Sequence, residues 1–101
     1  MLETLTAADF TPHLQSRFTV PLNSEESTTL ILINVSERSP EFAPPGSGRV
    51  PFALQFHGNH LKGNLPQQIW HLEHDALGAL DIFLVPISRD ANGMIYEAIF
   101  N

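Results

Sequence analysis

The sequence predicts an all-β domain, mainly antiparallel, built as a small barrel or sandwich of about six strands with a short N-terminal helix. Short segments rich in Val, Ile, Leu, Thr and Phe recur along the chain, and several of them alternate apolar with polar residues. Gly, Pro, Asn and Asp separate these segments. Strands at such close spacing favour hairpin connections, which are typical of sandwiches and small barrels.

We expect residues 1–101 to form one domain, because 101 residues is a common size for a single domain. The hydrophobic fraction of 43% is sufficient for a core. The charged fraction is 16%, below the usual value of about 25%. A surface with few charges tolerates contact with another protein.

The N-terminal residues 4–15 are expected to form one or two helical turns. Thr4 and Thr6 are candidate N-caps, and Pro12 interrupts or restarts the helix. The following segment, 17–22, carries Pro21, and a proline confines a strand to an edge or ends it early. An open edge there would admit a strand from a partner or from a second copy of the chain.

The strongest strand is residues 28–37, in which Leu30 to Ile33 are apolar without alternation. Such a run indicates burial on both faces or a central place in a closed barrel. Residues 38–49 contain three prolines and two glycines and are expected to form a mobile loop. Residues 50–58 then alternate as a clear strand.

The C-terminal part of the chain predicts a three-stranded meander from residues 69–74, 79–87 and 94–100. The turn before the last strand contains Asn92 and Gly93, residue types that readily adopt positive φ. Trp70 is the one tryptophan, and a large aromatic side chain on a strand beside loop ends is a candidate interface anchor. The predicted interface residues are Phe18, Val20, Leu22 and Trp70.

The charge of the chain argues against nucleic acid and membrane surfaces as partners. The formal net charge is −6, and five Lys and Arg residues are too few to neutralise many phosphates. The chain has no cysteine, so it forms no disulfide and has no thiolate chemistry. Without a recognisable leader or an apolar run long enough to cross a bilayer, the expected location is the cytoplasm.

The histidines raise a metal hypothesis. His71 and Glu73 share one face of their strand, whereas His71 and His74 project from opposite faces. A site that joins His57 to His71 and Glu73 across neighbouring strands would suit zinc or iron. The simpler interpretation is that these histidines lie at strand ends and are partly exposed. We therefore predict neither a metal nor any other cofactor.

No catalytic constellation stands out. The serines lie in loops without a Gly-x-Ser-x-Gly context, and Gly-Ser-Gly at 46–48 lacks the Lys and helix of a phosphate loop. Glu73, Asp75 and Asp81 lie around a turn, where carboxylates are common for structural reasons.

Several short segments spread over the chain carry a family resemblance: Leu5–Phe10, Leu65–Gln67, Leu72–His74, Leu77–Gly78, Phe83–Pro86, Gly93–Met94 and Tyr96–Asn101. In these segments the chain resembles an uncharacterised bacterial family of proteins about this long, a domain of unknown function. The resemblance covers nearly the whole chain except residues 39–48. The family has no assigned activity, and its genes can lie near those for phage-tail-collar-like proteins, which implies an assembly or structural role.

Together these observations predict a non-enzymatic protein-interaction or structural module, linked through the resemblance to phage-tail-like assemblies. The expected partner is another protein or a second copy of the chain as a homodimer. The alternative is a small β-barrel enzyme or a ligand- or metal-binding protein that uses His57, His71 and Glu73.

Overall fold

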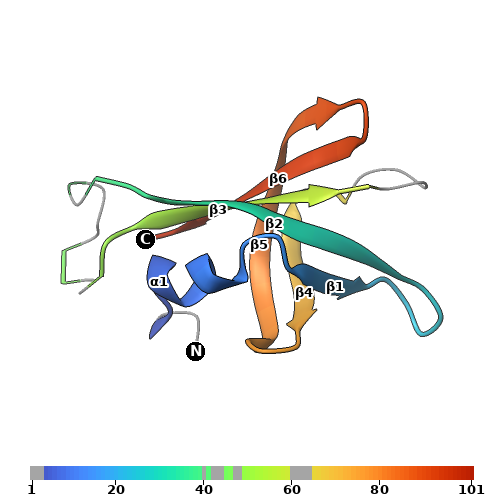
Figure 1. Ribbon diagram of the computed structural model, residues 1–101, viewed down its shortest axis with the longest axis horizontal. Helices are drawn as coiled ribbons and strands as arrows, with labels where there is room; N and C mark the ends of the chain where they lie inside the picture. The colour runs from blue at the N-terminus through green and yellow to red at the C-terminus, as the bar shows by residue number, and fades with distance from the viewer. Residues whose placement is uncertain (1–3, 40, 42–44, 47–48, 60–64) are drawn as a thin grey trace.

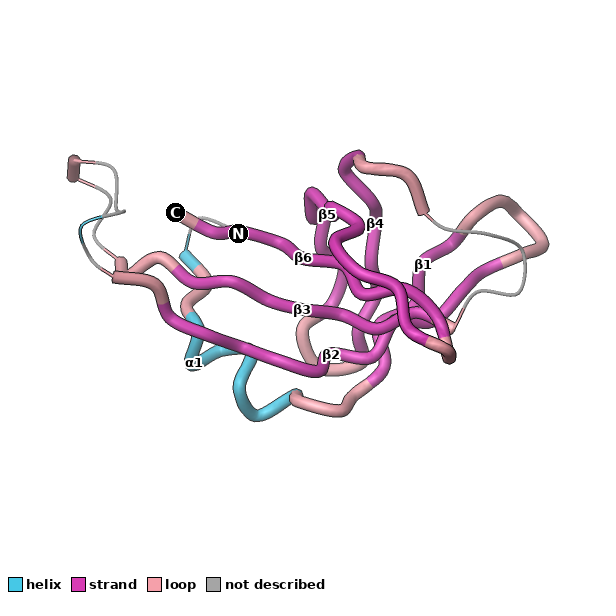
Figure 2. The backbone as a smooth tube through the Cα atoms, turned by 90° about the horizontal axis from the view of Figure 1, so that it is seen from above, coloured by secondary structure: helices cyan, strands magenta, loops and turns pink. Residues whose placement is uncertain are grey.

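The computed structural model describes residues 4–39, 41, 45–46, 49–59 and 65–101, which form a closed antiparallel β-barrel with a short N-terminal helix. Around the barrel the strands follow the order β1-β2-β3-β6-β5-β4, and β4 returns to β1. Figure 1 shows this arrangement, and Figure 2 shows β6, β3 and β2 side by side. The predicted fold class is confirmed as a barrel. The strands are β1 (Arg17–Pro21), β2 (Ser27–Glu37), β3 (Phe52–Gly58), β4 (Gln68–His74), β5 (Gly78–Asp90) and β6 (Gly93–Phe100).

The predicted three-stranded meander is present as β4, β5 and β6. β5 pairs with β4 through residues 78–84 and with β6 through residues 85–90, so this long strand serves two neighbours in succession. The sequence predicted its end near residue 87, but β5 continues to Asp90. The strand passes its proline because the register shifts between Pro86 and Ser88, and a bulge accommodates a residue that has no N–H to donate.

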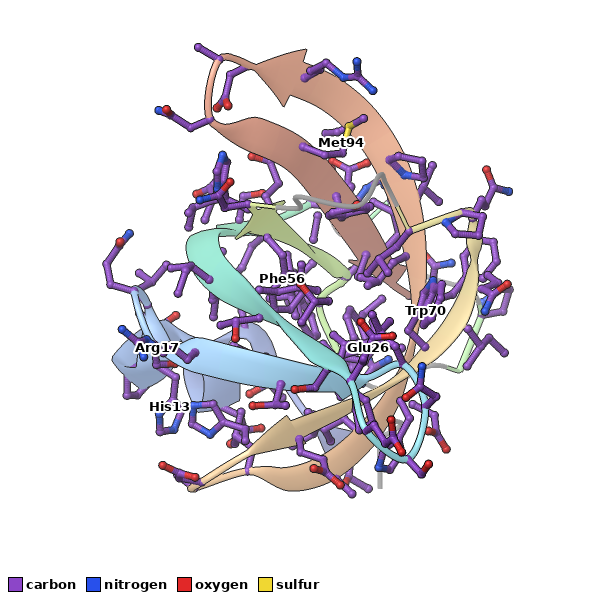
Figure 3. The ribbon with its side chains drawn as sticks, turned by 90° about the vertical axis from the view of Figure 1, so that its right-hand side faces the viewer. His13, Arg17, Glu26, Phe56, Trp70 and Met94 are labelled. Carbon is purple, nitrogen blue, oxygen red and sulfur yellow. The ribbon has the colours of Figure 1, made fainter. Side chains whose placement is uncertain are left out.

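The interior of the barrel is filled by side chains from alternate positions of the strands. Figure 3 shows Phe56 at the centre, where Phe18 meets it edge-to-face with ring centroids 5.2 Å apart. Within the described part of the chain, no charged or polar side chain other than Tyr96 is buried. The side chains that are almost completely buried are Tyr96, Phe10, Phe18, Phe52, Phe56, Leu30, Leu32, Leu54, Leu72, Ile82, Leu84 and Val20.

The apolar run in β2 takes the second of its two predicted environments, a central place in a closed barrel. Leu30 and Leu32 point into the interior and are fully buried, whereas Ile31 and Ile33 are only half-buried on the outer side. The strand is therefore covered on one face. Its outer isoleucines still fit a β-strand because branched side chains pack well on a pleated surface.

The N-terminal segment closes one end of the barrel. The N-cap of helix α1 (Ala7–Phe10) is Thr6, whose backbone N–H donates to the Asp9 carboxylate at 2.7 Å. A 3₁₀ turn η2 (Thr11–His13) follows directly and contains Pro12, the residue predicted to interrupt or restart the helix. Phe10 is buried against Phe52 and Phe100, with ring centroids 5.8 and 5.9 Å away. The apolar face of this short helix therefore depends on the barrel for its stability.

Arg49 joins both ends of the chain to the same aromatic cluster. Its guanidinium donates to the backbone carbonyls of Leu5 and Asn101, the latter at 2.9 Å. It also lies over the rings of Phe52 and Phe100, at 5.5 and 5.8 Å from their centroids. Cation–π contact and charge-assisted hydrogen bonds thus act on one side chain.

The predicted open edge at β1 is corrected by the closure of the barrel. β1 pairs with β2 through all five of its residues and with β4 through Thr19 and Glu73. A neighbour therefore lies on each side of β1, although the pairing with β4 is short. The predicted loop at 38–49 lies in part outside the described residues.

Gly93 provides a test of how the β5–β6 turn fits against β3. Its φ is +152°, and a Cβ there would collide with the carbonyl of Gly58. Asn92, the other residue predicted to supply positive φ, does not have it. We expect Gly93→Ala to lower the free energy of unfolding by about 3 kcal/mol or more, since strain and a backbone clash add.

Gly78→Ala is the matched control for this prediction. Gly78 has φ +78°, but a Cβ there would meet no atom within 4 Å. Gly78→Ala should lower the free energy of unfolding only by the strain of a left-handed backbone, about 1 kcal/mol. Urea unfolding of both variants measures the difference, and equal losses would contradict the close approach of Gly93 to β3.

Candidate functional site

Two large apolar side chains lie exposed and paired on the outside of the barrel. Ile69 on β4 and Phe83 on β5 are cross-strand partners, and they are 65% and 49% exposed. Directly opposed residues of an antiparallel pair lie close enough to touch. The pair therefore presents one apolar surface to the solvent.

Polar side chains continue this outer face toward the β4–β5 turn. His71 pairs with Asp81 in the register, and its Nδ1 lies 3.0 Å from the Asp81 carboxylate. The other ring nitrogen, Nε2, lies 3.3 Å from the Glu73 carboxylate. The hydrogen bond to Asp81, and then that to Glu73, raises the pKa of His71, because only an imidazolium donates to both carboxylates.

At the other end of the same face, Val85 pairs with Glu97 of β6, and both side chains are half-buried. Val85 lies two residues beyond Phe83 on β5, so their side chains share a face of the strand. We call this surface the acidic-apolar face. It comprises Ile69, His71, Glu73, Asp81, Phe83, Val85 and Glu97.

The metal site considered from the sequence does not form. His57 lies on β3, which is separated from β4 by two strands in either direction around the barrel, so His57 is far from His71 and Glu73. The two nitrogens of His71 also face different carboxylates. Among the residues that the structure describes, no group of three or more His, Asp or Glu side chains is arranged to hold a metal ion.

His57 has its own acidic neighbour. Its Nε2 lies 3.2 Å from the Asp90 carboxylate at the end of β5. That carboxylate also accepts the backbone N–H of Asn92 at 2.8 Å. The hydrogen bond from Asn92, followed by that from His57, lowers the pKa of Asp90. This contact supports the turn between β5 and β6.

His74 makes a contact with Ser16 that resembles a catalytic pair. Its Nε2 lies 2.9 Å from the Ser16 hydroxyl. Its Nδ1, however, accepts the backbone N–H groups of Ala76 and Leu77 at 3.0 and 3.1 Å. Nδ1 therefore carries no proton, and the neutral ring must carry its proton on Nε2.

This tautomer is the opposite of the one that activates a serine. A general base accepts the hydroxyl proton at Nε2 while Nδ1 is protonated, whereas here His74 donates to Ser16. The Ser16 hydroxyl in turn donates to the carbonyl of His13. The three residues therefore form a structural clasp between the N-terminal segment and the β4–β5 turn.

The clasp holds His74 in its neutral form. Burial, and then the nearby His13, whose ring centroid is 4.7 Å away, lowers the pKa of His74. The ring also packs on Phe18, with centroids 4.4 Å apart. A proton added at Nδ1 would remove the acceptor for two backbone N–H groups of the turn.

The residues predicted to form an interface have different environments. Phe18 and Val20 are fully buried in the barrel, so their side chains form core rather than surface. Leu22 is 44% exposed just after β1. Trp70 is half-buried and packs against the core from the inner side of β4, and its indole N–H donates to the Pro66 carbonyl at 2.9 Å.

Sequence reasoning missed Ile69 and Phe83 as exposed residues. The signal was present in the alternation, because Ile69 shares its strand face with His71 and Glu73, and Phe83 shares its face with Asp81. An apolar residue on an otherwise polar face points outward. The turn at residues 75–77 sets the register that places Ile69 opposite Phe83.

The fold and these clusters define a small closed β-barrel with an apolar interior and a mixed acidic and apolar outer face. The chain belongs to the family described as a domain of unknown function (DUF6916), which matches residues 5–100. No curated protein and no solved structure matches the chain. No helix in the described residues has the length and apolar character needed to cross a bilayer.

The opposite pKa shifts of the two β4 histidines give a pH prediction. The pKa of His74 is lowered, so its stabilising contribution is complete above its ordinary value of 6.5 and is lost as the pH falls below that value. We expect His74→Asn to reduce the loss of stability in acid, because an Asn carbonyl also accepts turn N–H groups and does not titrate. Urea unfolding from about pH 8 to about pH 5 measures this.

His71→Gln is the companion variant. The raised pKa of His71 means that its contribution is complete below 6.5 and is lost as the pH rises through its folded-state pKa. This variant should therefore steepen the loss of stability in acid. An identical pH dependence in both variants would contradict the two assigned environments.

Proposed function

We propose that the protein is a non-enzymatic protein-interaction module that docks through the acidic-apolar face. The observation that carries the proposal is the exposure of Ile69 and Phe83 as a cross-strand pair. Exposed aromatic and branched side chains in contact with one another are typical of interface centres, and polar residues commonly surround them.

The polar groups of the barrel support a binding role over catalysis. The described interior contains no charged side chain, and the histidines with defined partners are engaged in turns and ion pairs. Ser16 receives a hydrogen bond from His74 instead of losing a proton to it. The separation of His57 from His71 and Glu73 removes the main support for the alternative metal or ligand site.

The setting of this interaction is proposed from the family resemblance. An assembly role, in which the barrel joins components of a phage-tail-like structure, agrees with a module that binds through its outer surface. The cysteine-free chain agrees with a location in the cytoplasm, where thiols are kept reduced and structural disulfides are rare.

Site-specific photo-crosslinking tests the proposal. Phe83 is replaced by the photo-crosslinker p-benzoylphenylalanine, and the protein is irradiated in extract of its host cells. We expect a discrete adduct with one protein. Ile69→Ser in the same background should reduce its yield by about tenfold, because loss of an interface anchor weakens binding strongly.

The control places the same crosslinker at Asn34. This residue is exposed on β2, which has two strands between it and β5 in either direction, and it lies beyond the part of β2 that pairs with β1. No adduct is expected there. No adduct at position 83, or the same adducts at both positions, would refute docking through the acidic-apolar face.

A further inference from the structure

We propose that the acidic-apolar face binds an extended segment of a partner protein in which an apolar side chain is flanked, two residues away on each side, by Lys or Arg. This inference rests on the proposed function and specifies the chemistry of the partner. Two observations support the inference: the order of side chains along β5 and the charges at the two ends of the face.

The spacing on β5 matches that of an extended peptide. Asp81, Phe83 and Val85 lie at alternate positions on the outer side of the strand, with neighbouring positions about 7 Å apart. Alternate residues of an extended partner segment repeat at the same distance. An apolar partner side chain seated on Phe83 therefore has its second neighbours near the two ends of the face.

Both ends of the face carry carboxylates. Asp81 and Glu73 lie at the end near the β4–β5 turn, and Glu97 lies opposite Val85 at the other end. Their charges attract cations at both flanks of the apolar pair. This is the complement of a basic–apolar–basic segment, since matched charges around an apolar centre increase both association rate and specificity.

The cationic side chains near the acidic-apolar face do not cancel the negative charge of its carboxylates. His71 lies between its two carboxylates and neutralises one of them at most. Arg17 on β1 lies two residues from Thr19, the register partner of Glu73, and Arg89 lies on β5 beyond the register shift. None of the described Lys or Arg side chains lies among the seven residues of the face.

The charge distribution also disfavours a second copy as the occupant. A symmetric dimer brings the same patch of each copy together, so the carboxylates of both copies would gather around the shared apolar centre. The formal charge of −6 on each chain adds to this repulsion. A basic partner avoids this repulsion between carboxylates.

The test uses three synthetic peptides and NMR spectra of the ¹⁵N-labelled protein. The first peptide is Gly-Lys-Ser-Leu-Ser-Lys-Gly, blocked at both ends. In the second, Glu replaces both Lys residues, and in the third, Ser replaces Leu. We expect the first peptide to shift the amide signals of Ile69, Asp81 and Phe83 selectively, and to bind at least about tenfold more tightly than either of the others.

Variants on the face identify which groups contribute. Phe83→Ser should weaken binding of the first peptide by at least about tenfold. Asp81→Asn and Glu97→Gln should each weaken it by about two- to fivefold, the range typical of exposed charge pairs. Glu25→Gln is the matched control, because Glu25 is an exposed carboxylate in the β1–β2 loop outside the face, and it should change nothing.

Equal binding of the acidic peptide, signal shifts spread over other faces, or no shifts with any peptide would each overturn the inference. Self-association of the unlabelled protein through position 83, detected by ultracentrifugation and abolished by Phe83→Ser, would also overturn it. A position-83 crosslink to a partner together with failure of the basic peptide would reject the partner chemistry alone. Failure of both experiments would reject the proposed function as well.

Discussion

The closure of the barrel around an apolar interior is the constraint on which the other features depend. Six strands pair in a ring, and most of their inward side chains, with Phe56 at the centre, are buried. An interior of this kind leaves no place for an unpaired charge, because burying one without a partner costs several kcal/mol. The described carboxylates therefore lie outside, where they support turns and shape the surface, whereas His74, which packs on Phe18 from the inner side of β4, has hydrogen-bond partners at both ring nitrogens.

Strand pairing closes the barrel around its circumference, so other side-chain contacts must stabilise its ends. At one end, Phe10 covers Phe52 and Phe100, and Arg49 joins this cluster to the backbone near both termini. On another side, His74 connects the N-terminal segment to the β4–β5 turn through Ser16. Each of these sets of contacts links residues that are distant in sequence, so each forms only when the barrel has formed.

The strands and the meander were predictable because their signals are local. Alternation along β3 and β6 and the turn residues after β4 and β5 are visible within short windows of sequence. The sequence left open whether the strands form a closed barrel or a sandwich, because closure depends on Thr19 meeting Glu73, a pairing that no local pattern encodes. For the same reason the sequence left His57 and His71 as candidates for one site, although they lie on opposite strands of the ring.

The outward position of Ile69 and Phe83 is not explained by folding stability alone. A cross-strand apolar pair contributes about 0.2–1 kcal/mol relative to alanines, and Thr or Tyr would supply similar pairing with less apolar surface in water. Ile69 remains 65% exposed, so it recovers little of the free energy that burial would provide. In the proposed interaction, flanking carboxylates disfavour a second copy and favour a partner surface that carries Lys or Arg. The proposal of selective recognition thus accounts for an exposed apolar centre between acidic flanks, which the fold does not require.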